Sequence, residues 1–136
     1  MAIKFLAFLG KNRYTAGRYE LNGYLSIHTP FSQVAVLDVL QSQNIAPDDV
    51  YIFLTSEARR QNWADSGSGA PASGVWLKDQ LAELQHRLGF SVHDIAIPDE
   101  QDQGAIWSIF ARVIDCLDTY DEVIFDVTHR FGTNPC

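Results

Sequence analysis

Several features that assign a protein quickly are missing from this sequence. The two cysteines, Cys116 and Cys136, have neither the spacing of a metal site nor the pattern of a disulfide framework. No apolar run approaches the roughly 20 residues that a membrane-spanning helix needs. The first residues enter an apolar strand pattern directly, without the basic flank and cleavage site of a signal peptide. These absences predict a reduced, cytoplasmic protein with no bound metal and no membrane partner.

A surplus of positive charge is missing as well. The chain has 10 Lys and Arg residues against 17 Asp and Glu residues, which gives a net charge of −7. Nonspecific nucleic-acid binding depends on many phosphate contacts, so this charge argues against DNA as a partner. A small anionic ligand in a local basic site remains compatible with it. The positions of the basic residues therefore matter more than their total.

Apolar strand patterns alternate along the chain with helical patterns. Strands are predicted over residues 2–9, 48–55, 91–97 and 123–127, and helices over 29–44, 57–63, 75–88 and 99–120. The Asn22-Gly23 pair predicts a small hairpin after the first strand, and residues 65–74 are predicted to form a mobile loop. This order predicts a single Rossmann-like α/β domain with a mainly parallel sheet and helices on both faces.

The order of the strands in space follows from the handedness of their connections. Right-handed crossovers place the strands in the order third, second, first, last. The direction of winding then reverses between the first and last strands, and ligands of such sheets bind outside the carboxyl ends at that point. The loops that meet there are residues 10–15 and 128–134.

Basic residues gather in the loops that follow the predicted strands. Six of the ten lie there: Lys11, Arg13, Arg18, Arg59, Arg60 and Arg130. Ammonium and guanidinium groups suit phosphate, the backbone N–H groups around Gly10 add donors, and Tyr14 offers a face for a base. A solvated surface role is an equal alternative for Arg59 and Arg60. A single glycine at position 10 makes neither a dinucleotide fingerprint nor a P-loop.

The end of the last strand holds further polar candidates. His129 lies between Thr128 and Arg130 and is the strongest single candidate for a functional side chain. Asp126 lies within the apolar strand, and we expect it to be a buried hydrogen-bond acceptor that pins a loop, in preference to a catalytic group. The three tryptophans are expected in a core or an interface: Trp63, Trp76 and Trp107.

Collinear stretches over most of the chain carry a family resemblance. They are Phe8-Leu9-Gly10, Tyr14, Tyr19, residues 29–35, residues 54–59 with Asn62-Trp63, residues 97–99, and residues 121–129 with the sequence Asp-Glu-Val-Ile-Phe-Asp-Val-Thr-His. Together they resemble the DxTHG family of CRISPR-associated CARF proteins. The family continues Gly-Phe-Arg after its histidine, whereas this chain reads Arg130-Phe131-Gly132. It also stops at Cys136, so we expect a CARF-like domain, residues 1–136, without the C-terminal elements and effector domain of the family.

The resemblance implies a sensor of type III CRISPR antiviral signalling. Such a domain binds a cyclic oligoadenylate, cyclic tetra-adenylate or hexa-adenylate, across a homodimer, needs no cofactor and acts on a separate effector protein. The implied ligand-binding residues are Gly10, Lys11, Asn12, Arg13, Tyr14, Thr55, Thr128, His129 and Arg130. The first alternative is a ring nuclease that cleaves its ligand by metal-independent attack of a 2′-hydroxyl, with Lys11, Asn12 and His129 contributing. The second is a sequence-specific regulator or scaffold in which the domain only mediates assembly, and the third is a nonfunctional remnant.

Overall fold

The sheet of this protein has four parallel strands, and their order agrees with the expected one. A computed structural model describes residues 2–11, 14–21, 23–65, 69–98, 103–118 and 121–126. The sheet has the order β5-β4-β1-β6, in which every pairing is parallel. The strands are β1 (Ile3–Leu9), β4 (Asp49–Leu54), β5 (Ser91–Ala96) and β6 (Glu122–Asp126). In order along the chain these are first, second, third and last, so the predicted arrangement is confirmed.

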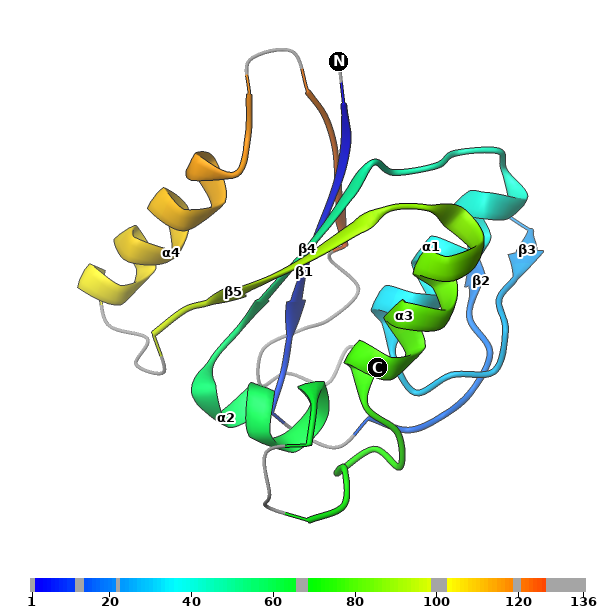
Figure 1. Cartoon of the computed structure of the whole chain (residues 1–136), viewed down its shortest axis with the longest axis horizontal. Coiled ribbons are helices and arrows are strands. Elements are labelled where there is room, and N and C mark those ends of the chain that lie inside the picture. Colours follow the sequence, from blue (N-terminus) through cyan, green and yellow to red (C-terminus); the bar gives the residue numbers. More distant parts are fainter. Residues whose placement is uncertain are drawn as a thin grey trace.

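Helices lie on both sides of the sheet. The helices α1 (Ser32–Ser42) and α3 (Leu77–Leu88) pack on one face, and α4 (Gln103–Asp115) lies on the other side, as Figure 1 shows. The connection from β5 through α4 therefore carries the chain over the opposite face to reach β6. This is the architecture of a Rossmann-like α/β fold, as the alternating sequence pattern predicts. Within the described segments, no helix is long and apolar enough to cross a membrane.

Four further short elements lie in the described part of the chain. The hairpin of β2 (Glu20–Leu21) and β3 (Tyr24–Leu25) lies outside the main sheet, and Gly23 adopts the positive φ of 84° that its turn requires. The helix α2 (Ser56–Ala58) follows β4 and continues into a π-helical turn, η1 (Arg59–Trp63). The hairpin and the short helix after the second strand were both expected from the sequence.

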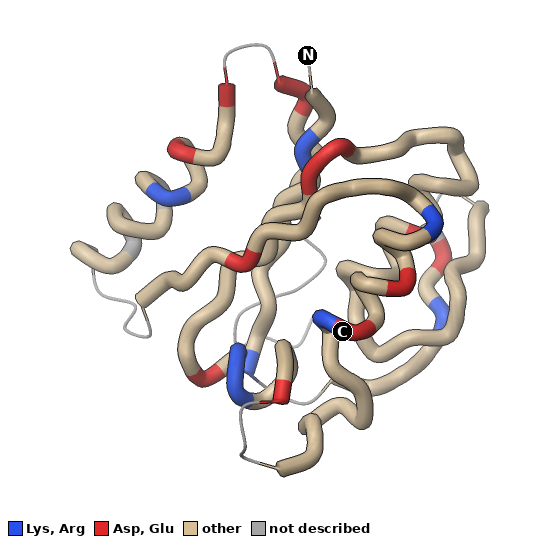
Figure 2. Tube along the Cα trace, in the orientation of Figure 1, with Lys and Arg blue, Asp and Glu red and all other residues tan. Residues whose placement is uncertain are grey.

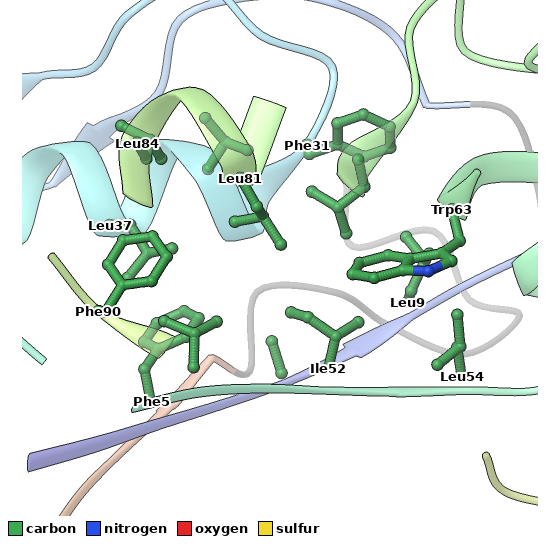
Figure 3. Packing of buried hydrophobic residues seen from close by; sticks show 14 of the residues in the cluster. Phe5, Leu9, Phe31, Leu37, Ile52, Leu54, Trp63, Leu81, Leu84 and Phe90 are labelled. Carbon is green, nitrogen blue, oxygen red and sulfur yellow. The ribbon is translucent and has the colours of Figure 1, made fainter. Parts of the chain in front are cut away.

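The hydrophobic core lies between the sheet and the pair α1 and α3. Alternate residues of the two central strands face these helices: Phe5, Ala7 and Leu9 from β1, and Val50, Ile52 and Leu54 from β4. Figure 3 shows this sheet layer beneath Phe31, Leu37, Leu81, Leu84 and Trp63. Each fully buried side chain of this size contributes about 1.5–3 kcal/mol. Trp63 is 3% exposed, so the expectation of a core role is confirmed for this tryptophan.

The helix α4 is shorter than the sequence pattern predicts. The prediction extended it to residue 120, but it ends at Asp115, and the N–H groups of Cys116 and Leu117 donate to carbonyls three residues earlier. The ammonium group of Lys4 donates to the Cys116 carbonyl at 2.7 Å, which supplies a partner that another helical turn would otherwise provide. The prediction was wrong because this partner lies 112 residues away in the sequence.

Lys4 fixes the connection between α4 and β6. Its ammonium group lies 2.8 Å from the Asp121 carboxylate and 3.8 Å from that of Asp118. The side chains of Lys4 and Asp121 are 10% and 6% exposed. The hydrogen bond with Asp121 raises the pKa of Lys4, and the same bond lowers the pKa of Asp121 below its usual range. Both shifts show that the fold favours the charged forms of this pair.

We predict that Lys4→Met lowers the stability of the fold in a pH-dependent way. A carboxyl with a lowered pKa contributes stability above its ordinary value of 3.8 and loses it as the pH falls. A lysine with a raised pKa contributes stability below 10.5 and loses it as the pH rises. The stability difference between wild type and variant should therefore be largest between these values. Thermal unfolding over a pH series measures it, and Lys78→Met on the exposed side of α3 is the control. A pH-independent difference would contradict the assignment.

Candidate functional site

The candidate site lies where the direction of winding reverses, between β1 and β6. The two strands are parallel neighbours, and Ala7 pairs with Asp126 at the end of β6. On the other side of β1, Leu9 pairs with Leu54, so Gly10 and Thr55 leave the sheet side by side. The carboxyl ends of three strands thus meet at one edge, as the predicted strand order requires. This is the usual place for ligands of open α/β sheets.

Four residues join the chain after β1 to two later segments through hydrogen bonds. The Gly10 N–H donates to the Tyr14 hydroxyl at 2.7 Å, and the Tyr14 N–H donates to Ser73 Oγ at 2.8 Å. Ser73 Oγ donates to Asn62 Oδ1 at 2.8 Å, and Asn62 Nδ2 donates to the Gly10 carbonyl at 2.9 Å. The bonds close on themselves, and we call these four residues the Gly10 network. They leave both backbone groups of Gly10 satisfied by side chains.

The side chain of Tyr14 is largely enclosed. Its ring packs at a tilt against Phe31 in the core, with 5.3 Å between the ring centres. Burial raises the pKa of Tyr14 to about 12, while hydrogen bonds from the Gly10 backbone and the Gln33 side chain act in the opposite direction. Tyr14 is therefore a neutral phenol at physiological pH. In this position it supports the loop, and a role in base stacking stays a prediction.

Thr55 lies at the same edge and caps the helix that follows β4. Its Oγ1 accepts a hydrogen bond from the Ala58 N–H at 3.1 Å, which is the usual interaction of an N-cap threonine. This bond turns the chain from β4 into α2 and η1, and so places Asn62 beside Gly10. Asn62 is fully buried although it is polar, because both ends of its amide are bonded within the Gly10 network.

The arginines after β4 are paired with carboxylates. Arg59 lies 2.7 Å from Asp94 on β5, and Arg60 pairs with Glu57 three residues earlier. These side chains are between 37% and 50% exposed, so the pairs are weak surface interactions. Lys11, by contrast, is exposed directly after β1. Figure 2 shows Lys and Arg segments interspersed with Asp and Glu segments over the described chain.

The first turn of α1 brings the buried polar side chains of Ser32 and Gln33 to this edge, where Ser32 meets Asp126 of β6. Asp126 is 6% exposed and accepts a hydrogen bond from Ser32 Oγ at 3.3 Å, which confirms that it is a buried acceptor. Its bond is to the first residue of α1, and the expectation that it pins a loop stays a prediction. Gln33 is fully buried and donates through Nε2 to the Phe8 carbonyl at 2.8 Å. Its Oε1 atom has no hydrogen-bond partner in the described part of the chain.

Five of the predicted site residues lie outside the described residues: Asn12, Arg13, Thr128, His129 and Arg130. Of the others, Gly10, Lys11, Tyr14 and Thr55 follow two adjacent strands at one edge. The sequence reasoning did not identify Asn62, Ser73 or Gln33. A signal existed for Gln33, because it is a polar residue between the apolar residues Phe31 and Val34 of a buried helix pattern. Asn62 gave a weaker one, since it follows the polar residues Arg59, Arg60 and Gln61. Ser73 gave none, since it lies in a segment rich in glycine and serine.

Comparisons with known proteins assign no family to this chain, so it is classified by its fold alone. The sequence matches no protein-family model, and a search of curated proteins finds no significant relative. The architecture defines the chain as a Rossmann-like α/β protein. In the described ranges, no group of three or more His, Cys, Asp or Glu side chains is placed to hold a metal ion.

We predict that Tyr14→Phe destabilises the fold by about 1–2 kcal/mol, because the Gly10 N–H loses its acceptor in a partly buried place. A tyrosine with a raised pKa loses its contribution to stability as the pH rises from 10 towards 12. The wild type should show this loss in urea unfolding more strongly than the variant. Tyr24→Phe on the exposed hairpin is the control. Equal stabilities of wild type and Tyr14→Phe would contradict the assigned hydrogen bond.

Proposed function

We propose that this chain is a sensor of type III CRISPR signalling that binds a cyclic oligoadenylate across a homodimer. Cyclic tetra-adenylate is the first candidate ligand. The observation that carries the proposal is the place of the loop from Gly10 to Tyr14, directly after β1 at the reversal of winding. Anionic nucleotides bind at this place in open α/β sheets. The resemblance of the collinear sequence stretches to the DxTHG family supports the same ligand class.

The charges at this edge support an anionic ligand of limited size. Lys11 is exposed after β1 and is available to a phosphate group. Arg59 and Arg60 are held in exposed ion pairs, and such pairs contribute little, so a phosphate can compete for them. The net charge of −7 opposes long nucleic acids, for which many phosphate contacts are needed. A small cyclic oligonucleotide needs few contacts and fits both observations.

Exposed apolar side chains support the homodimer. Trp107 and Ile114 on α4 are 66% and 65% exposed, and Val123 and Phe125 on β6 are 43% and 41% exposed. Large apolar residues exposed on neighbouring surfaces are typical of proteins that bind another protein, and we propose that these residues contribute to such a surface. A second copy of the chain is the partner that we propose, because a two-fold symmetric ligand matches two identical subunits.

We predict that calorimetry will show cyclic tetra-adenylate bound with one ring for two chains. Lys11→Ala should weaken binding about fivefold, because it removes one charged contact. Added salt should weaken the wild type more than the variant. Lys78→Ala is the matched control, since Lys78 is an exposed lysine on α3. Failure of the wild type to bind any cyclic oligoadenylate would refute the proposal.

We also predict that bound ligand stays intact. Chromatography of cyclic tetra-adenylate after prolonged incubation with the protein should recover the complete ring. Cleavage by a 2′-hydroxyl requires that the attacking oxygen is aligned with the adjacent phosphate, a requirement of positioning that binding alone does not meet. The appearance of linear di-adenylate, lost again in Lys11→Ala, would contradict the sensor proposal and establish the ring-nuclease alternative.

A further inference from the structure

The segment after η1 returns to the carboxyl edge of the sheet. The Ala72 N–H donates to the Gln61 carbonyl at 2.9 Å. The Gly74 N–H donates to the Pro71 carbonyl at 3.2 Å and closes a turn. Gly74 has a positive φ of 86°, which suits glycine at this turn. These contacts present Ser73 to the loop that follows β1. Through Ser73, this segment thus contacts Tyr14 of the loop in which the sequence places the ligand contacts.

Ser73 connects the two loops through one hydroxyl group. Its Oγ accepts from the Tyr14 N–H and donates to Asn62 Oδ1, each at 2.8 Å. Tyr14 lies 59 residues before Ser73 in the sequence, and Asn62 lies 11 residues before it. One hydroxyl therefore satisfies a backbone donor and a buried side-chain acceptor. Removal of the hydroxyl leaves both groups without this partner. A buried polar group that loses its hydrogen bond costs the folded state free energy.

We infer that Ser73 and Asn62 are positioning residues for the ligand loop, and this inference rests on the proposed function. They act through Gly10 and Tyr14, whose backbone they hold on either side of Lys11. Held in this way, the described ends of the loop, at Gly10 and Tyr14, are in place before the ligand arrives. A ligand that meets an ordered loop loses less affinity to the cost of ordering it. The segment 69–76 thus tunes the affinity of the site.

The expected effect follows from the population of the ordered loop. When a substitution lowers the fraction of molecules in the binding arrangement, the apparent dissociation constant rises by the same factor. Loss of the hydrogen bonds of one hydroxyl corresponds to a change of about five- to tenfold. The core does not include Ser73, and the residue is only half-buried in a loop. The global stability of the chain should therefore fall no further than in Tyr14→Phe, which removes another hydrogen bond of the Gly10 network.

The test compares Ser73→Ala with Ser73→Thr, which keeps the hydroxyl, and with Ser42→Ala as the control. Ser42 makes a single weak hydrogen bond to Asp38 on the exposed side of α1. Calorimetry with cyclic tetra-adenylate should show the dissociation constant raised about five- to tenfold in Ser73→Ala and near the wild-type value in the other two. Amide hydrogen exchange should be faster at Tyr14 in Ser73→Ala, with no change at Phe5 in the core.

The outcomes separate this inference from the proposed function. If the wild type binds the ligand and Ser73→Ala binds it equally well, the positioning role is wrong and the sensor proposal stands. Unchanged exchange at Tyr14 would also overturn the positioning role, because the Ser73 hydroxyl would then not hold that amide. If the wild type binds no cyclic oligoadenylate, both the sensor proposal and this inference are refuted. Faster exchange at Phe5 in the core of Ser73→Ala, as well as at Tyr14, would indicate a general structural role and overturn the inference.

Discussion

The end of a buried parallel strand imposes a constraint on this protein, because its last backbone groups must find partners away from bulk water. At the end of β1 the chain meets this constraint with side chains from three separate segments. The Tyr14 hydroxyl accepts a hydrogen bond from the Gly10 N–H, and the Asn62 amide donates one to the Gly10 carbonyl. Ser73 is hydrogen-bonded to both Tyr14 and Asn62. The cap at Thr55 places Asn62, and the turn at Gly74 places Ser73. The candidate site is built on this satisfied strand end.

The two ends of the sheet use charge in different ways. At the amino end, Lys4 and Asp121 form a well-enclosed pair that fixes the connection from α4 to β6. At the carboxyl end, the pairs Arg59–Asp94 and Arg60–Glu57 are exposed and contribute little to stability. A structural pair must be hard to break, whereas cations near a ligand site must be able to change partners. The distribution of burial therefore assigns a structural role to the pair at the amino edge and leaves the arginines of the carboxyl edge free to serve the proposed site.

Most of the fold could be predicted because its signals are local. The apolar runs of β1 and β4, the Asn22-Gly23 turn and the stop of α3 at Gly89 each depend on neighbouring residues. The end of α4 could not be predicted in this way. The lysine that binds the Cys116 carbonyl lies at the other end of the chain, and nothing near residue 116 indicates it. The same limit applies to Ser73, whose partners Tyr14 and Asn62 lie in other loops.

The sequence by itself determined the fold class, the order of the strands and the edge at which polar loops gather. These follow from hydrophobic periodicity and from the handedness of crossovers, both of which are properties of short segments. Tertiary structure alone decided that Tyr14 is enclosed, that Arg59 and Arg60 are paired, and that Asn62 and Ser73 complete the strand end. A hydrogen bond needs two groups within about 3 Å, and pattern along a chain carries no information on distances between remote residues.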